Sequence, residues 1–192
     1  MNAVGTVCSL LAVAGAAVTP PVVMSWQMKH TRHFAAVRAG VLYRSGQPTV
    51  AGLTRILHDH HIRTIICLRE ESESTRAEAV WCARNEVQFH RITPRNWDGP
   101  PGNAAVDEPL RQVLDILRDP ANHPVLIHCL AGTHRTGGYV AVWRMEAEGW
   151  ANEEALAEMR SMGYSTIDTD LDINEYLRAY KPGALTRRAD GR

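Results

Sequence analysis

The segment of the chain richest in reactive side chains runs from Val125 to Gly138 and reads VLIHCLAGTHRTGG. Its apolar start predicts a buried strand that ends at Cys129, and the five residues that follow predict a tight loop before Arg135 opens a helix. A strand-loop-helix turn of this kind points consecutive backbone N–H groups inward, and the helix N-terminus adds roughly half a positive charge. The segment is therefore expected to hold a phosphate.

The side chains of this segment fit phosphoryl transfer. The positive potential is expected to lower the pKa of Cys129 below the usual thiol value of about 8.5, so that it supplies a thiolate nucleophile. Arg135 can bind two phosphate oxygens, and the Thr136 hydroxyl can donate to the sulfur when it departs. His128 is interpreted as a supporting donor that orients the loop. The expected phosphate-binding residues are Leu130, Ala131, Gly132, Thr133, His134 and Arg135.

The composition of the chain limits the kinds of protein and binding site that it can form. The chain has 192 residues, 45% of them hydrophobic and 22% charged, which is typical of one globular domain. Its 21 basic and 21 acidic residues cancel, so no overall field attracts nucleic acid, and anion recognition must be local. The four cysteines form no C-x-x-C pair, and the run from His58 to His61 is interpreted as a solvated helix end. No metal and no cofactor are expected.

From Gly40 onward, short β-branched runs alternate with longer amphipathic stretches. This pattern predicts an α/β fold with a central, mainly parallel sheet of four to five strands flanked by helices, followed by an all-helical C-terminal part. Asn152 is the candidate N-cap of one late helix. The predicted strands cover 41–43, 63–68, 86–91 and 125–128, and the predicted helices cover 50–60, 73–85, 106–119, 136–148, 152–162 and 168–180.

The ends of the chain differ from this domain, which is predicted to span residues 29–181. Residues 1–28 precede the first charged side chain, Lys29, and form an apolar segment. Residues 3–24 are interpreted as a membrane tether that leaves the domain facing the cytoplasm, because basic residues follow them. A cleaved signal with export is one alternative, and a plain apolar tail or a misassigned start is the other. Residues 182–192 are predicted to be a flexible tail.

The Cys129-to-Arg135 spacing, with His128 before it and Thr136-Gly137 after it, resembles the cysteine-dependent protein tyrosine phosphatases, specifically their dual-specificity branch. Residues 41–48 (VLYRSGQP), 64–71 (TIICLREE) and 119–124 (DPANHP) resemble plant and fungal atypical dual-specificity phosphatases and their bacterial relatives. The resemblance covers about Val41 to Tyr180. It implies a phosphatase fold, a phosphocysteine intermediate and phosphorylated protein or small phosphorylated molecules as substrates.

Such a phosphatase also needs a general acid for the leaving oxygen. The resemblance implies an Asp about thirty residues before the cysteine, and Asp98 in the RNWDGPP stretch fits that place. Trp97 and the two following prolines are expected to stiffen its loop and shield it from water. Asp107 is the alternative, although it is expected to begin a helix.

The substrate and the other cysteines remain open at this point. The loop positions carry no lysine, which favours one phosphate, such as phosphotyrosine on a protein, over inositol phosphates or pyrophosphates. Arg91 and Arg95 keep the inositol alternative open, and a catalytically silent phosphate-binding module is the other alternative. Arg69 either approaches the site or pairs with its neighbouring glutamates. Cys67 and Cys82 are interpreted as core thiols, with capture of an oxidised Cys129 as the alternative.

Overall fold

The computed structural model of the chain describes Ser25 and residues 29–185. The predicted tether over 3–24 and the last seven residues of the predicted tail lie outside the described residues. Within the described part, no helix is long and apolar enough to cross a bilayer.

The centre of the domain is a five-stranded sheet, as predicted, with the strand order β1-β2-β5-β3-β4. Strand β1 pairs antiparallel with β2, and the other neighbouring strands are parallel. The edge strand β1 was not among the predicted elements, because its sequence AAVR lacks a sustained apolar pattern. The strands are β1 (Ala35–Arg38), β2 (Leu42–Ser45), β3 (Thr64–Cys67), β4 (Gln88–Arg91) and β5 (Val125–His128).

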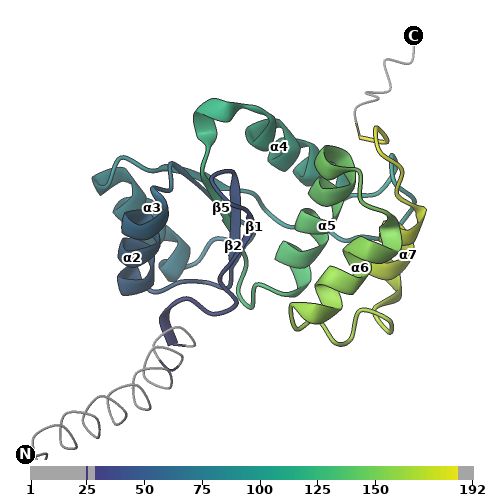
Figure 1. Cartoon of the computed structure of the whole chain (residues 1–192), viewed down its shortest axis with the longest axis horizontal. Coiled ribbons are helices and arrows are strands. Elements are labelled where there is room, and N and C mark those ends of the chain that lie inside the picture. Colours follow the sequence, from purple (N-terminus) through teal and green to yellow (C-terminus); the bar gives the residue numbers. More distant parts are fainter. Residues whose placement is uncertain (1–24, 26–28, 186–192) are drawn as a thin grey trace, which may run out of the picture.

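Helices cover both faces of this sheet (Figure 1). Helices α2 (Val50–His60) and α3 (Glu73–Arg84) pack on one face around a smaller core that includes Leu53, Ile65 and Leu126. The other face carries the larger core and the remaining helices, which are α4 (Asp107–Arg118), α5 (His134–Glu148), α6 (Asn152–Ser161) and α7 (Leu171–Ala179). A single 3₁₀ turn, Pro120–Asn122, follows α4 within the described part.

The alternation of side chains along β5 decides which face each reactive group occupies. Leu126 belongs to the core under α2 and α3, whereas Ile127 and Cys129 belong to the core under α4 to α7. His128 therefore points toward the α2 and α3 face, where it lies in register with Cys67 of β3. The nucleophile candidate and its neighbour thus lie on opposite faces of one strand.

Asn152 does not cap the start of its own helix, contrary to the prediction. It is the first residue of α6, and Ala151 occupies the N-cap position. Its side-chain Nδ2 instead donates to the carbonyl oxygens of Leu177 at 2.6 Å and Tyr180 at 2.9 Å. Asn152 therefore satisfies carbonyl groups at the end of α7, which the sequence around position 152 does not reveal.

The folded domain also extends past residue 181. Residues 182–185 form turns, and Leu185 is buried in the larger core with 2% of its surface exposed. The Gly183 N–H donates to Glu146 Oε1 of α5 at 2.7 Å. The beginning of the predicted flexible tail is therefore part of the fold.

Candidate active site

The loop between β5 and α5 has its carbonyl groups held outward by the residues around it. Because a trans peptide places its N–H opposite its C=O, these bonds leave the loop N–H groups directed inward. One of them, Gly132 N, donates to Cys129 Sγ at 3.2 Å. The outward bonds are His128 Nδ1 to Cys129 O at 3.4 Å, Gln47 N to Leu130 O at 3.1 Å, His33 Nδ1 to Ala131 O at 2.7 Å and Arg44 Nη2 to Gly132 O at 2.8 Å.

Gly132 permits the tight packing of this loop against the end of β2. Its φ of +81° lies in the left-handed region, and a Cβ there would come within 2.3 Å of Gly46 N. A Cβ at Gly46 would in turn lie 2.8 Å from Ala131 O. The two segments therefore meet backbone against backbone, and the loop has the shape of an anion-binding nest at the N-terminus of α5.

The surroundings of Cys129 at the base of the nest favour the thiolate form. Burial by itself would raise the pKa of this thiol, which is 3% exposed. The Thr136 hydroxyl and the N–H groups of Thr136, Gly132 and Ala131 outweigh burial and hold the pKa of Cys129 below its ordinary value. The buried Thr136 hydroxyl has no nitrogen or oxygen partner within the described chain, which leaves it for the sulfur. The direction of this pKa shift, and its origin in hydrogen bonds from the loop and the start of the helix, agree with the expectation from the sequence.

Arg44 places a buried cation under the loop, on the same face of the sheet as Cys129. Only 1% of its surface is exposed. Burial lowers the pKa of Arg44, and the charges of Glu158 and Cys129 act in the opposite direction. The guanidinium thus fixes the Gly132 carbonyl and adds positive potential near the sulfur. The resemblance marked this stretch of β2, but only strand pairing shows that Arg44 lies beneath the loop.

His128 forms a buried ion pair with Glu78 of α3, on the opposite face of the sheet. His128 Nε2 lies 2.9 Å from Glu78 Oε1, and the two side chains are 0% and 2% exposed. Burial opposes the charge on the imidazole, but the contacts with Cys67 and Glu78 prevail and raise the pKa of His128 to about 10. Glu78 was missed in the sequence, although it shares the buried face of α3 with Thr75 and Cys82 at helical spacing.

The ion pair continues to the rim of the loop through Gln47. Gln47 Nε2 donates to Glu78 Oε2 at 2.9 Å, and Arg69 Nη1 donates to Gln47 Oε1 at 2.7 Å. Arg69 also donates to Ser74 Oγ at 3.0 Å, so its bonds run to this network and not to the neighbouring glutamates. The network ties β2, β3 and α3 to the loop.

Among the described residues, Cys67, Glu78 and His128 also form a group of three ligand-type side chains whose ligand atoms all lie within 4.8 Å of one another. A histidine must be neutral to bind a metal ion. His128 pairs with the Glu78 carboxylate at 2.9 Å, and this contact favours the charged imidazole. Two members of this group are thus engaged with each other in an ion pair.

A pocket of about 390 Å³ adjoins the end of the loop at His134 and Arg135 and is lined on its other sides by distant parts of the chain. Arg135 and His134 line it from the loop side, and Asp98 lines it from the segment after β4. The alternative acid, Asp107, is not among the lining residues; it is buried and accepts hydrogen bonds from Tyr176 OH at 2.7 Å and Ala104 N at 2.9 Å. Asp107 thus has a structural environment, whereas Asp98 faces the same space as Arg135.

Trp97 anchors the segment that carries Asp98. Its buried ring meets Tyr139 of α5 and Tyr176 of α7 edge-on, with centroids 5.8 Å and 5.1 Å apart. Gly138 makes room for it, because a Cβ there would lie 2.6 Å from Trp97 Cζ2. Trp97 therefore fixes the loop as expected, but the expected shielding is wrong, because Asp98 itself is exposed.

His134, the last of the five loop residues, is held by the segment between α6 and α7. Its Nε2 lies 3.5 Å from Asp170 Oδ2, and its ring packs on Tyr164 with centroids 5.1 Å apart. Tyr164 OH also donates to Asp170. Burial lowers the pKa of His134; Asp170 opposes this shift and Arg135 adds to it. The loop therefore carries no charge before Arg135 near neutral pH.

The two other described cysteines are core thiols, as interpreted. Cys67 and Cys82 are buried and free, and burial with the nearby Glu78 raises the pKa of Cys82 to about 12. Both lie on the α2 and α3 face of the sheet, and Cys129 lies on the other face. The arrangement does not support the alternative that either of them captures an oxidised Cys129.

Several known proteins are similar to this chain in sequence. The chain is 28% identical to the dual specificity protein phosphatase TpbA of Pseudomonas aeruginosa over 141 residues, which cover 71% of this chain and 58% of TpbA. It is 27% identical to the tyrosine-protein phosphatase-like protein OCA2 of Saccharomyces cerevisiae, over 57% of this chain and 54% of that protein. The inositol diphosphatase DSP3 of Arabidopsis thaliana is 30% identical over 74% of this chain and 68% of its own length. The chain thus spans little more than half the length of the first two relatives.

Solved structures show the same fold. The catalytic core of the PP-IP phosphatase SIW14 from S. cerevisiae superposes with a TM-score of 0.66 at 22% identity, over 82% of this chain and 91% of that one. The crystal structure of P. aeruginosa TpbA gives a TM-score of 0.62 at 22% identity, over 82% and 94% of the two chains. The sequence model of the tyrosine phosphatase family matches residues 30–190, so this chain belongs to the tyrosine phosphatase family.

Proposed function

We propose that the chain is a cysteine-dependent phosphatase of the dual-specificity type that hydrolyses phosphate monoesters through a phosphocysteine. The observation that carries this proposal is the orientation of the loop: its carbonyls are bound outward while Gly132 N–H points at Cys129 Sγ. Such a nest binds the equatorial oxygens of a phosphoryl group in the position where the thiolate can attack.

In the first step, Cys129 Sγ attacks phosphorus and the bond from phosphorus to the ester oxygen breaks. Arg135 and the loop N–H groups stabilise the charge on the transferred group. Asp98, which shares the pocket with Arg135, delivers its proton to the departing oxygen. The products of this step are a phosphocysteine and a neutral alcohol or phenol.

In the second step, water attacks phosphorus and gives a proton to Asp98, which is now a carboxylate. The bond from phosphorus to sulfur breaks, and the electron pair returns to Cys129 as a thiolate. The Thr136 hydroxyl, which helps to hold the pKa of Cys129 low, stabilises the departing sulfur. Inorganic phosphate then leaves.

The loop favours substrates with one phosphate, such as a phosphotyrosyl protein. Leu130, Ala131, Gly132 and Thr133 are uncharged, and the pKa of His134 is lowered mainly by burial. Each further phosphate would lose water without gaining a cation from the loop.

An assay with 4-nitrophenyl phosphate tests the proposal. The unmodified chain should turn over, and Cys129→Ser should abolish turnover while still binding tungstate, a phosphate analogue. Cys82→Ala, which removes a buried thiol on the other face of the sheet, should retain activity. Tungstate binding by the unmodified chain without turnover would identify the silent module instead.

A further inference from the structure

The pocket beside the loop has a second wall, formed by the N-terminal end of α7. Asp170 precedes this helix, Asp172 lies in its first turn, and both line the pocket together with Arg135 and Asp98. The buried side chains of Ile173, Tyr176 and Leu177 hold α7 in the larger core. The helix therefore places the two carboxylates beside the pocket that, under the proposed function, receives the part of a substrate next to its reacting phosphate.

Each of these aspartates has a defined environment. Asp170 accepts a hydrogen bond from Tyr164 and lies 3.5 Å from His134 Nε2, so it is tied to the loop. Asp172 is fully exposed beside Asp98, and the contact with that carboxyl group raises the pKa of Asp172. Asp172 can thus be replaced without breaking a buried contact.

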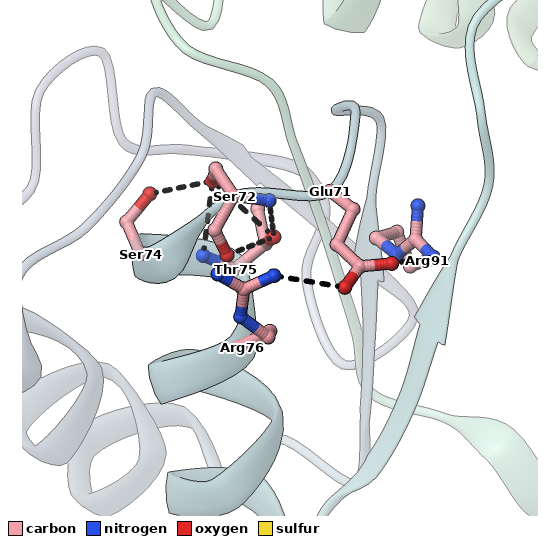
Figure 2. A network of polar contacts seen from close by, with 6 residues as sticks. All are labelled: Glu71, Ser72, Ser74, Thr75, Arg76 and Arg91. Atoms are coloured by element: carbon pink, nitrogen blue, oxygen red, sulfur yellow. Dashed lines mark hydrogen bonds and ion pairs between the residues drawn. The ribbon is translucent and has the colours of Figure 1, made fainter.

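The cations near the pocket do not balance these acids. Its lining includes four acidic residues and two arginines. One of these arginines, Arg135, is assigned to the reacting phosphate by the proposed function. Arg91 is not among the lining residues, contrary to the suggestion of its place in the sequence. Figure 2 shows the Glu71 carboxylate between Arg76 and Arg91, at 3.0 Å and 3.1 Å. Arg95 is therefore the one arginine of the lining left for a second phosphate.

We propose that Asp172, together with Asp170, is a specificity-determining residue that rejects substrates with a second phosphate beside the reacting one. This inference rests on the proposed phosphatase function and adds a wall outside the loop to its selectivity. A second phosphate would bring one to two negative charges next to these carboxylates. The repulsion would weaken binding of the doubly phosphorylated substrate and would leave the chemical step itself unchanged. Singly phosphorylated segments of proteins fit the pocket best.

Two peptides test the proposal, identical except that one carries a phosphoserine next to its phosphotyrosine. The ratio of their kcat/KM values isolates the second phosphate, because both use the same nucleophile and acid. Asp172→Asn should raise this ratio in favour of the doubly phosphorylated peptide by on the order of threefold to tenfold at low salt, and Asp172→Lys should raise it further. The kcat/KM for an inositol pyrophosphate should likewise rise in Asp172→Asn and rise further in Asp172→Lys.

The matched controls are Glu175→Gln and Glu175→Lys, which change an exposed charge on the same helix that does not line this pocket but lies within electrostatic reach of Asp172. The same ligands are also measured by calorimetry in the Cys129→Ser background, so that binding is read without turnover. A ratio that responds several-fold more strongly to position 172 than to position 175 supports the proposal. Equal responses, no response, or tenfold preference of the unmodified chain for the second phosphate would overturn it. Binding of neither peptide would refute the proposed phosphate site itself.

Discussion

His128 Nε2 lies 2.9 Å from Glu78 Oε1 in a fully buried pair beneath the phosphate loop. The other ring nitrogen of His128 donates to the carbonyl of Cys129 at 3.4 Å. One imidazolium therefore connects a carboxylate on α3 to the backbone of the nucleophile candidate. From the opposite face of the sheet, the pair orients the first peptide of the loop.

Replacing Glu78 should expose both roles of this pair. Glu78→Gln leaves a buried imidazole without its counter-ion, so we expect a loss of about 3–5 kcal/mol in the free energy of unfolding near pH 6. The pKa of His128 is raised to about 10, above the unfolded value of about 6.5. The stabilisation is thus complete below about pH 6.5 and is lost as the pH rises through about 10. In denaturant titrations, the difference in unfolding free energy between the unmodified chain and Glu78→Gln should therefore become smaller as the pH rises across this range.

The same variant should shift catalysis in pH. Without Glu78 to hold it, His128 orients the Cys129 carbonyl less firmly, and the loop N–H groups then stabilise the Cys129 thiolate less well, so the acidic limb of kcat/KM should move to higher pH. Glu73→Gln, an exposed change on the same helix, should leave that limb and the pH dependence of stability unchanged. A destabilised Glu78→Gln protein with an unmoved acidic limb would reduce Glu78 to a structural role.

Arg44 should matter for activity more than for stability. Its Nη2 holds the Gly132 carbonyl, but its Nε and Nη1 have no partner within the described chain. Because a buried ion is often replaced by an apolar residue at little cost, Arg44→Met should change the unfolding free energy by no more than about 2 kcal/mol. The loop would lose an orienting bond and a nearby cation, and kcat/KM should fall by about a hundredfold. Unchanged kinetics with 4-nitrophenyl phosphate would remove Arg44 from the positioning of the loop.

The leaving group distinguishes Asp98 from Asp107. Asp98→Ala should lower the rate for phosphotyrosine by about 10²–10⁴-fold, and less for an ester whose leaving group needs little protonation. The basic limb of the pH profile should flatten, because the proton donor is gone. Asp107→Asn should destabilise the protein through its bonds to Tyr176 and Ala104 but keep the bell-shaped profile. The reverse pattern would transfer the acid role to Asp107.

The local sequence was sufficient to predict the phosphate-binding loop, because the strand, the five-residue turn and the start of the helix follow one another between residues 125 and 138. Amphipathic spacing was likewise sufficient for helices such as 50–60 and 152–162, whose predicted and observed bounds agree within a residue. The surroundings of the loop could not be predicted in this way. Arg44 and Glu78 reach it through strand pairing and helix packing over long sequence separations, and Asp170 through the fold of the C-terminal helices.

The most direct test of the account is to trap the phosphocysteine. Without Asp98 as base, hydrolysis of the intermediate should slow, while a good leaving group still allows it to form. Asp98→Ala is mixed with 4-nitrophenyl phosphate, quenched in acid, digested and examined by mass spectrometry. We predict a phosphoryl group on Cys129 in Asp98→Ala, and no phosphoryl group at this position in the double variant that also carries Cys129→Ser. A phosphoryl group on another residue, or full turnover by Cys129→Ser, would contradict the account.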